Sequence, residues 1–130
     1  MRIGFAVLAV AAGGAFGSVA RYLISTWSFA RFGPSFPWGT FVINLTGSFL
    51  IGVVFGLAAA RGGMSPYLRV FLTTGVLGGY TTFSSFAFET YTLGAEGAYV
   101  RAGAYALGSL VLGVAAAYAG LVAVRLAAPT

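Results

Sequence analysis

The stretch Gly75-Val-Leu-Gly-Gly-Tyr-Thr-Thr-Phe-Ser-Ser-Phe86 decides the fold, because it places glycines and hydroxyl side chains in the middle of an apolar run. In hydrocarbon, a backbone N–H or C=O group without a partner is costly. An unwound stretch therefore persists there only where protein buries it, where it lines water or where it binds an ion. The sequence predicts a membrane helix that Gly75, Gly78 and Gly79 divide, with a break near 75–82, and it marks this break as the working part of the molecule.

The composition around this stretch is that of an integral membrane protein. Of the 130 residues, 59% are hydrophobic and 7% are charged, and the mean hydropathy is +0.95. A spanning helix takes about 20 apolar residues. We therefore expect an all-α fold in which four transmembrane helices, the third of them broken, form a single membrane domain over the whole chain. The predicted spans are 3–26, 38–60, 66–93 and 98–126.

The first apolar run has a second interpretation. One basic residue, an apolar core and the small residues Ser18-Val-Ala20 also match a signal peptide, whose cleavage would leave three spans. The apolar run continues through Arg21 to Ile24, however, and this length favours a retained helix.

The residues that are missing exclude most enzyme chemistry. The chain has no Cys and no His, so it lacks thiol nucleophiles, Cys-based metal sites and the commonest general base. We expect no enzyme. The net charge of +5 comes from Arg residues that stand singly, without the basic stripe that nucleic-acid binding needs. We interpret them as anchors in loops and at the membrane interface.

The arginines are almost evenly divided between the two sides of the membrane. With four spans, both termini lie on the same side of the membrane. The arginines on that side are Arg2, Arg61, Arg69 and Arg125, and those on the opposite side are Arg21, Arg31 and Arg101. An excess of positive charge normally sets orientation. Near balance predicts insertion in both directions, which permits antiparallel pairing of two copies. The alternative is a single orientation, if Arg21 and Arg101 lie too deep in their helices to count.

Polar side chains repeat at helical spacing on two of the predicted spans. Thr40, Asn44 and Ser48 share one face of the second span, and Tyr105 and Ser109 form a similar pair on the fourth. The amide of Asn44 is a hydrogen-bond donor suited to an anion. A structural hydrogen bond between helices is an equally open interpretation for Asn44, Tyr105 and Ser109.

Two phenyl rings follow the break. Phe83 and Phe86 lie one turn apart, with the hydroxyls of Ser84 and Ser85 on adjoining faces. Packing is the more common role for such rings in a membrane helix. Their electropositive edges, however, can attract an anion without offering it a full positive charge.

Three ordered motifs carry a resemblance that covers nearly the whole chain. They are Gly13-Gly-Ala-Phe-Gly-Ser-Val-Ala-Arg-Tyr22, Gly39-Thr-Phe-Val-Ile-Asn-Leu-Thr-Gly-Ser-Phe49, and the stretch 75–86 followed by Glu89. With these motifs in this order, the chain resembles the bacterial Fluc (CrcB-type) fluoride channels. The resemblance implies a passive, selective channel that exports fluoride, confers fluoride resistance and resides in the bacterial cytoplasmic (inner) membrane as a multi-pass protein.

The same resemblance implies an assembly and a set of site residues. The assembly is an antiparallel, dual-topology homodimer with two pores and one central structural sodium ion, which main-chain carbonyls of Gly78 and Thr81 would hold. A vestibule residue, Arg21, would attract anions. The residues implied for the fluoride path are Asn44, Phe83, Phe86, Ser84, Ser85, Tyr105 and Ser109.

The chain departs from the family pattern at two positions. Ser85 stands where the motif often has Thr, which keeps the hydroxyl. Gly113 stands one turn beyond Ser109, where relatives can have a further hydroxyl, so the polar track is expected to be shorter here. Some relatives are encoded as pairs that form heterodimers, whereas the balanced arginines favour a homodimer.

Two other classes of membrane protein fit parts of the sequence. A small multidrug exporter is also a four-helix dimer, but it needs a carboxylate in its first helix, and this first span has none. Glu89 lies after the break, as a vestibule residue or a partner for Arg. A structural protein without transport would leave Asn44 and the broken third helix unexplained.

Overall fold

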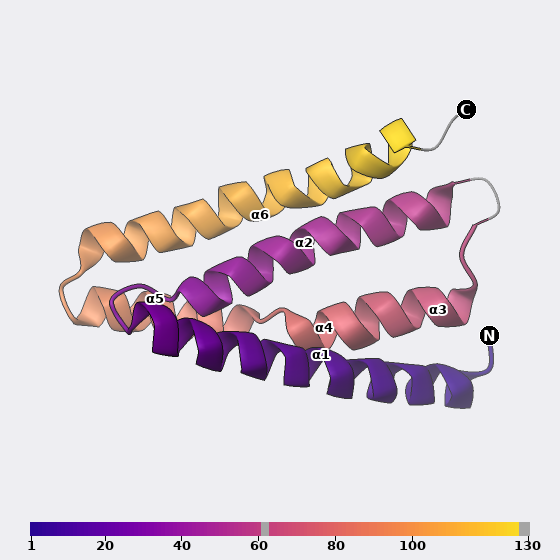
Figure 1. The fold of residues 1–130 in the computed structure, drawn as a ribbon, viewed down its shortest axis with the longest axis horizontal. Helices are drawn as coiled ribbons and strands as arrows, with labels where there is room; N and C mark the ends of the chain where they lie inside the picture. The colour runs from indigo at the N-terminus through magenta and orange to yellow at the C-terminus, as the bar shows by residue number, and fades with distance from the viewer. Residues whose placement is uncertain (61–62, 128–130) are drawn as a thin grey trace.

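The computed structural model describes residues 1–60 and 63–127, and this part of the chain is helical apart from short connections (Figure 1). The N-terminus and the end of the last helix lie at the same end of the bundle. Arg61, which we predicted on that side, lies outside the described residues. The elements are α1 (Ile3–Phe32), α2 (Trp38–Ala59), α3 (Pro66–Val70), the π-helix η1 (Phe71–Leu77), α4 (Gly78–Tyr80), α5 (Phe83–Ala95) and α6 (Tyr99–Ala127).

Within the described residues, three helices, α1, α2 and α6, are long and apolar enough to cross a membrane. The helix α1 continues past the predicted residue 26 to Phe32. It ends at Gly33, whose φ of 72° suits glycine and which precedes Pro34. The remaining segment consists of two shorter pieces in sequence, residues 66–80 and 83–95, and we call these the first and second half-helices. Each is shorter than a span requires.

The break between the two half-helices is narrower than predicted. Only Thr81 and Thr82 leave the helical conformation, with ψ values of 158° and 117°. The prediction that Gly75, Gly78 and Gly79 divide the helix is wrong, because all three lie within η1 and α4. The second half-helix restarts at Thr82, whose hydroxyl accepts the Ser85 N–H at 3.2 Å as an N-cap.

Glycines bring the first half-helix against α1. A Cβ atom on Gly17 would collide with the carbonyl oxygen of Val76, and one on Gly79 would collide with the carbonyl of Gly14. Backbone therefore meets backbone along this contact, which is the close approach that small residues permit between membrane helices. Two of the glycines that we expected to unwind the helix, Gly75 and Gly79, serve instead to pack it against α1.

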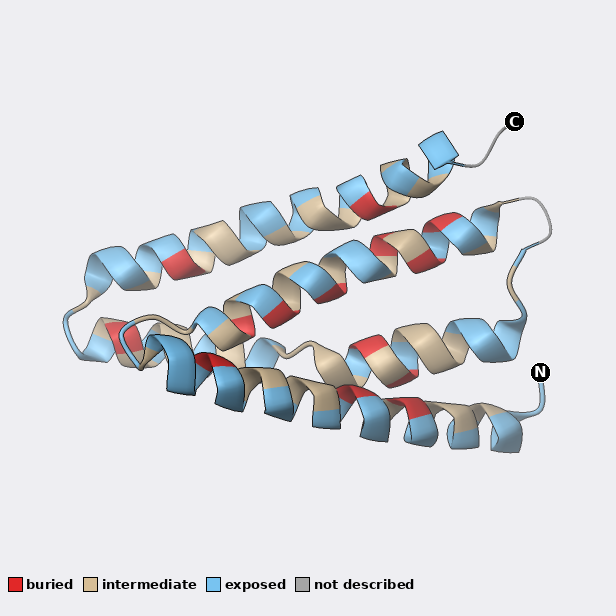
Figure 2. Cartoon of the chain, viewed as in Figure 1, coloured by how far each residue is buried: buried red, intermediate tan, exposed pale blue. Residues whose placement is uncertain are grey.

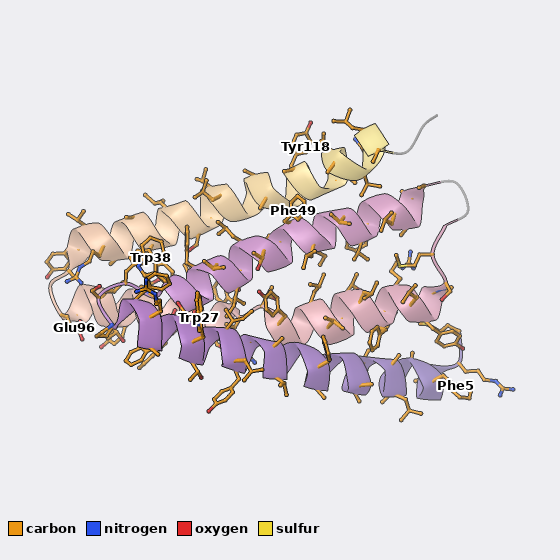
Figure 3. All side chains as sticks on the ribbon, in the orientation of Figure 1. Phe5, Trp27, Trp38, Phe49, Glu96 and Tyr118 are labelled. Atoms are coloured by element: carbon orange, nitrogen blue, oxygen red, sulfur yellow. The ribbon has the colours of Figure 1, made fainter. Side chains whose placement is uncertain are left out.

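The helices α2 and α6 form a second close pair, where Gly52 meets Ala117 and Gly120 meets Phe49. Figure 2 shows that buried residues lie on the inner faces, while the outer faces of α1 and α6 are exposed. Few side chains are wholly buried, and Ile43 and Tyr105 are the largest of these among the described residues. Figure 3 shows Trp27, Trp38 and Glu96 near one end of the bundle and Phe5 near the other.

Candidate functional site: a polar cavity at the helix break

Asn44 on α2 bonds both backbone groups of Thr82 in the break. Its Oδ1 accepts the Thr82 N–H at 2.9 Å, and its Nδ2 donates to the Thr82 carbonyl at 3.0 Å. This side chain replaces the hydrogen bonds that the unwound backbone loses, which is what hydrocarbon requires. A structural bond between helices, which the sequence left open, is therefore present. An amide has two N–H groups, so one remains after the bond to Thr82.

The break leaves carbonyl oxygens at the end of the first half-helix without donors. Because the Thr82 N–H turns to Asn44, the Gly78 carbonyl loses the donor it would have in a continuous helix. Among the described residues, no hydrogen bond reaches the carbonyl of Gly78 or of Thr81. These oxygens lie at the negative end of the helix dipole, and a hard cation prefers oxygen ligands of this kind.

A cavity of about 390 Å³ lies beside the break, and we call it the break cavity. Parts of α2, η1, both sides of the break, α5 and α6 line it. No charged side chain takes part in this lining within the described chain. Its lining residues include Asn44, Ser48, Thr73, Gly78, Thr81, Thr82, Phe83, Phe86 and Ser109.

Ser109 supplies an unused hydrogen-bonding group to this cavity. Its hydroxyl oxygen is buried and has no hydrogen-bond partner among the described residues. A buried polar atom without a partner is uncommon in proteins and calls for an explanation such as a bound ion or water. The break cavity therefore contains a hydroxyl that can donate to a guest.

The two phenyl rings after the break differ in burial. Their centroids lie 5.7 Å apart, and both rings line the break cavity. Phe86 is partly buried and packs on the ring of Tyr105 at a centroid distance of 5.2 Å. Phe83 is 79% exposed in the single chain, so the cavity reaches the surface of the chain at this ring.

Three side chains that the sequence did not connect form a hydrogen-bonded group next to the cavity. Glu89 on α5 accepts from Thr40 Oγ1 at 2.8 Å and from the Tyr105 hydroxyl at 2.7 Å. The carboxylate thus has hydroxyl partners rather than the arginine that we considered as one alternative. A carboxylate within an apolar helix was the available signal, but its partners come from distant helices and only the fold brings them together.

The remaining predicted site residues lie outside the lining of the break cavity. Ser84 and Ser85 have their hydroxyls 3.3 and 3.2 Å from the Thr82 hydroxyl, at the start of α5. Tyr105 is fully buried behind Phe86 and bonds Glu89. Arg21 is partly exposed on α1. The fold therefore brings Asn44, Phe83, Phe86 and Ser109 together at the break cavity. Gly78 and Thr81, whose carbonyl oxygens were predicted to hold sodium, line the same cavity.

Comparison with known proteins gives a consistent result. The family model described as CrcB-like protein, Camphor Resistance (CrcB) matches residues 8–121. A relative in Rhizobium meliloti (strain 1021), named Fluoride-specific ion channel FluC, is 56% identical over 87 residues, which are 67% of this chain and 70% of the relative. A relative of the same name in Agrobacterium fabrum (strain C58 / ATCC 33970) is 56% identical over 84 residues, 65% of this chain and 67% of its own length. A third, in Roseiflexus sp. (strain RS-1), is 51% identical over 87 residues, 67% of this chain and 70% of the relative.

Proposed function

The chain belongs to the CrcB-like family, and from this premise we propose that it is a passive, selective fluoride channel. The names of its relatives support fluoride as the ion. The observation that carries the proposal is the break cavity, where an amide, an unpartnered hydroxyl and two phenyl rings meet without any charged side chain among the described residues. An ion channel changes no covalent bonds, so no catalytic residue is required.

The lining of the break cavity suits a small, strongly hydrated anion. A selective path must replace the water around fluoride with other donors while binding the ion weakly enough to release it. The second N–H of Asn44 and the hydroxyl of Ser109 are neutral donors, and the edges of Phe83 and Phe86 carry partial positive charge. A fixed arginine at this point would hold the ion more strongly, and the described lining has none.

We propose that two copies pair antiparallel and that the broken segment acts as a fourth span in each. Gly78 at the break is exposed in the single chain and its carbonyl accepts no hydrogen bond from the described residues, so a second copy would cover a polar backbone group that lipid suits poorly, together with the exposed ring of Phe83. The near balance of arginines supports insertion in both directions. Each copy brings one break cavity, and the dimer would have two pores.

A central structural sodium ion would fit the carbonyl oxygens at the break. The free carbonyl oxygens of Gly78 and Thr81 are neutral, hard ligands, and the same pair from the second copy would double their number. When bound, the ion would supply a positive charge that attracts the carbonyl oxygens of both copies and so stabilises the contact between their breaks. The two carbonyls of each chain are held in position by the bonds between Asn44 and Thr82.

The other residues implied by the family resemblance keep their proposed roles. Arg21 would attract anions toward a vestibule, and Ser84, Ser85 and Tyr105 would extend the polar track beyond the break cavity. In the bacterial inner membrane, passive outflow through such a path would protect the cytoplasm from fluoride that enters as the neutral acid. That outflow is the proposed basis of fluoride resistance.

Fluoride efflux from liposomes tests the proposal. Purified protein is reconstituted with internal fluoride, a potassium ionophore is added, and a fluoride electrode records release beside a chloride electrode on chloride-loaded vesicles. We expect fast fluoride release and no chloride release. Equal release of both ions, or no release from protein shown to be folded and dimeric, would contradict the proposal.

A further inference from the structure

A second cavity, of about 600 Å³, lies at the end of the bundle that carries the α1–α2 connection, and we call it the outer cavity. It is bounded by the last turns of α1, by residues 33–37 and by the start of α2, with Glu89 on α5 also in the lining. Trp38, one of its lining residues, is seen near this end of the molecule in Figure 3. The outer cavity therefore lies where the helices meet the aqueous phase.

Ser28 gives the outer cavity an unused donor. Its side chain is only 5% exposed, yet its hydroxyl takes part in no hydrogen bond with the described residues. The nearby Thr26 contrasts with it, because the Thr26 hydroxyl donates to the Tyr22 carbonyl at 2.8 Å. Among the described residues only the Ser109 hydroxyl is both fully buried and without a partner, so the Ser28 hydroxyl is instead accessible from the outer cavity and can donate to a guest that enters it.

Gly39 lets the start of α2 approach α1 closely beside Ser28. A Cβ atom at Gly39 would lie 3.2 Å from the Cα of Ser25 and 3.6 Å from the Ser28 hydroxyl oxygen. A side chain here would therefore crowd the part of α1 that carries Ser25 and Ser28. The Ser25 hydroxyl lies in the same lining, so the guest meets two neutral donors, Ser25 and Ser28, whereas the Thr40 hydroxyl already donates to Glu89.

A thin partition separates the outer cavity from the break cavity. Thr40 and Glu89 line the outer cavity and bond each other, and Glu89 also accepts from Tyr105. The other side of the Tyr105 ring meets Phe86, which lines the break cavity. The two cavities thus lie on either side of one group of side chains.

From this arrangement we propose that the outer cavity is a mouth of the fluoride path and that Ser28 is its first hydrogen-bond donor to the ion. The inference rests on the proposed channel function and adds a residue and a route to it. The Glu89 carboxylate repels an anion and keeps it on the Ser28 side of the cavity. The site binds weakly because its donors are neutral, which favours passage over retention.

The absence of Cys allows this proposal to be tested by thiol labelling. Ser28→Cys protein in detergent is treated with a positively charged, water-soluble methanethiosulfonate reagent, its modification is followed by mass spectrometry, and it is then reconstituted for fluoride efflux. Ala30→Cys is the matched control, since Ala30 lies on the same helix and lines neither cavity. We expect modification of the Ser28→Cys thiol to be slowed by fluoride but not by chloride, and to remove most of the fluoride efflux, whereas treated Ala30→Cys keeps its efflux.

Two further variants keep the test decisive if the cysteine variant folds poorly. Ser28→Ala is expected to lower fluoride efflux about fivefold, the change that loss of one neutral hydrogen bond brings, while Ser28→Thr retains it. An unreactive thiol in the Ser28→Cys protein, or a modified thiol there with undiminished efflux, would overturn the proposed mouth while the efflux of untreated protein still supports the channel. Absence of fluoride efflux from the unaltered protein would overturn the channel function itself.

Discussion

The two half-helices on either side of Thr81 and Thr82 are held in different ways. The first half-helix meets α1 through glycines, backbone against backbone. The second is held by hydrogen bonds to Glu89 and by the packing of Phe86 on Tyr105. In lipid, close packing of small residues gives a helix a fixed place without polar groups. The first half-helix is thus a scaffold, and the polar groups that an ion can use lie at the break and beyond it.

Gly17→Ala should have the largest effect, because it disrupts the packing of the first half-helix against α1. The new Cβ would collide with the Val76 carbonyl, and backbone cannot turn away as a side chain can. We expect a loss of about 3 kcal/mol of stability, the upper end of typical overpacking costs, and therefore little folded protein. Thermal unfolding in detergent measures it. Gly14→Ala is the control, since its Cβ would lie 4.0 Å from the Gly75 carbonyl; equal stability of the two variants would contradict the backbone contact.

Asn44→Asp tests the link between scaffold and site. The aspartate still accepts the Thr82 N–H but cannot donate to the Thr82 carbonyl, and it brings a negative charge to the break cavity. We expect fluoride efflux to fall roughly thousandfold, since two like charges about 4 Å apart repel by about 4 kcal/mol at an effective dielectric constant of ~20. Gel filtration should still show an intact dimer. Normal efflux would exclude Asn44 from the path.

Phe83→Ile separates the role of a ring edge from that of mere bulk. Isoleucine is apolar but has no electropositive edge, so we expect fluoride efflux to fall at least roughly tenfold, as loss of about 1.4 kcal/mol of stabilisation would cause. Phe88→Ile is the matched control, because Phe88 lies on the same half-helix, is 70% exposed and does not line the break cavity. A similar fall in both variants would show that any ring on α5 matters equally.

Tyr105→Phe should have the smallest effect, and this effect should be confined to the second half-helix. It removes one of the two donors to Glu89 while keeping the rings of Phe86 and Phe36 packed. We expect a loss of about 1 kcal/mol and faster amide hydrogen exchange in residues 83–95, with residues 66–80 unchanged. Tyr91→Phe, at an exposed position on α5, is the control. Faster exchange in both half-helices would mean that the two are not held independently.

Much of this arrangement could be predicted from the sequence, and the remainder depends on contacts between distant helices. The apolar runs indicate the spans, and the hydroxyl-rich stretch locates the break. The glycines of the third segment were misinterpreted, because their effect depends on whether Gly13 and Gly17 lie opposite them. A glycine weakens a lone helix but permits close approach to another.

The candidate site shows the same limit on prediction from local patterns. Asn44 and Ser109 stand out as polar residues in apolar helices, and both reach the break cavity. Their helical spacing placed Ser48 and Thr40 on the face of Asn44, yet Thr40 turns to Glu89. The bonds among Thr40, Glu89 and Tyr105 join residues from three helices, and no spacing within one helix indicates them.

The current carried by the protein in a planar bilayer, under a fluoride gradient with equal chloride on both sides, tests the central claim most directly. A passive and selective fluoride channel predicts a current that reverses at the fluoride equilibrium potential and keeps this reversal when a chloride or proton gradient is imposed. A reversal potential that follows chloride or protons, or the absence of current from folded dimeric protein, would contradict the account.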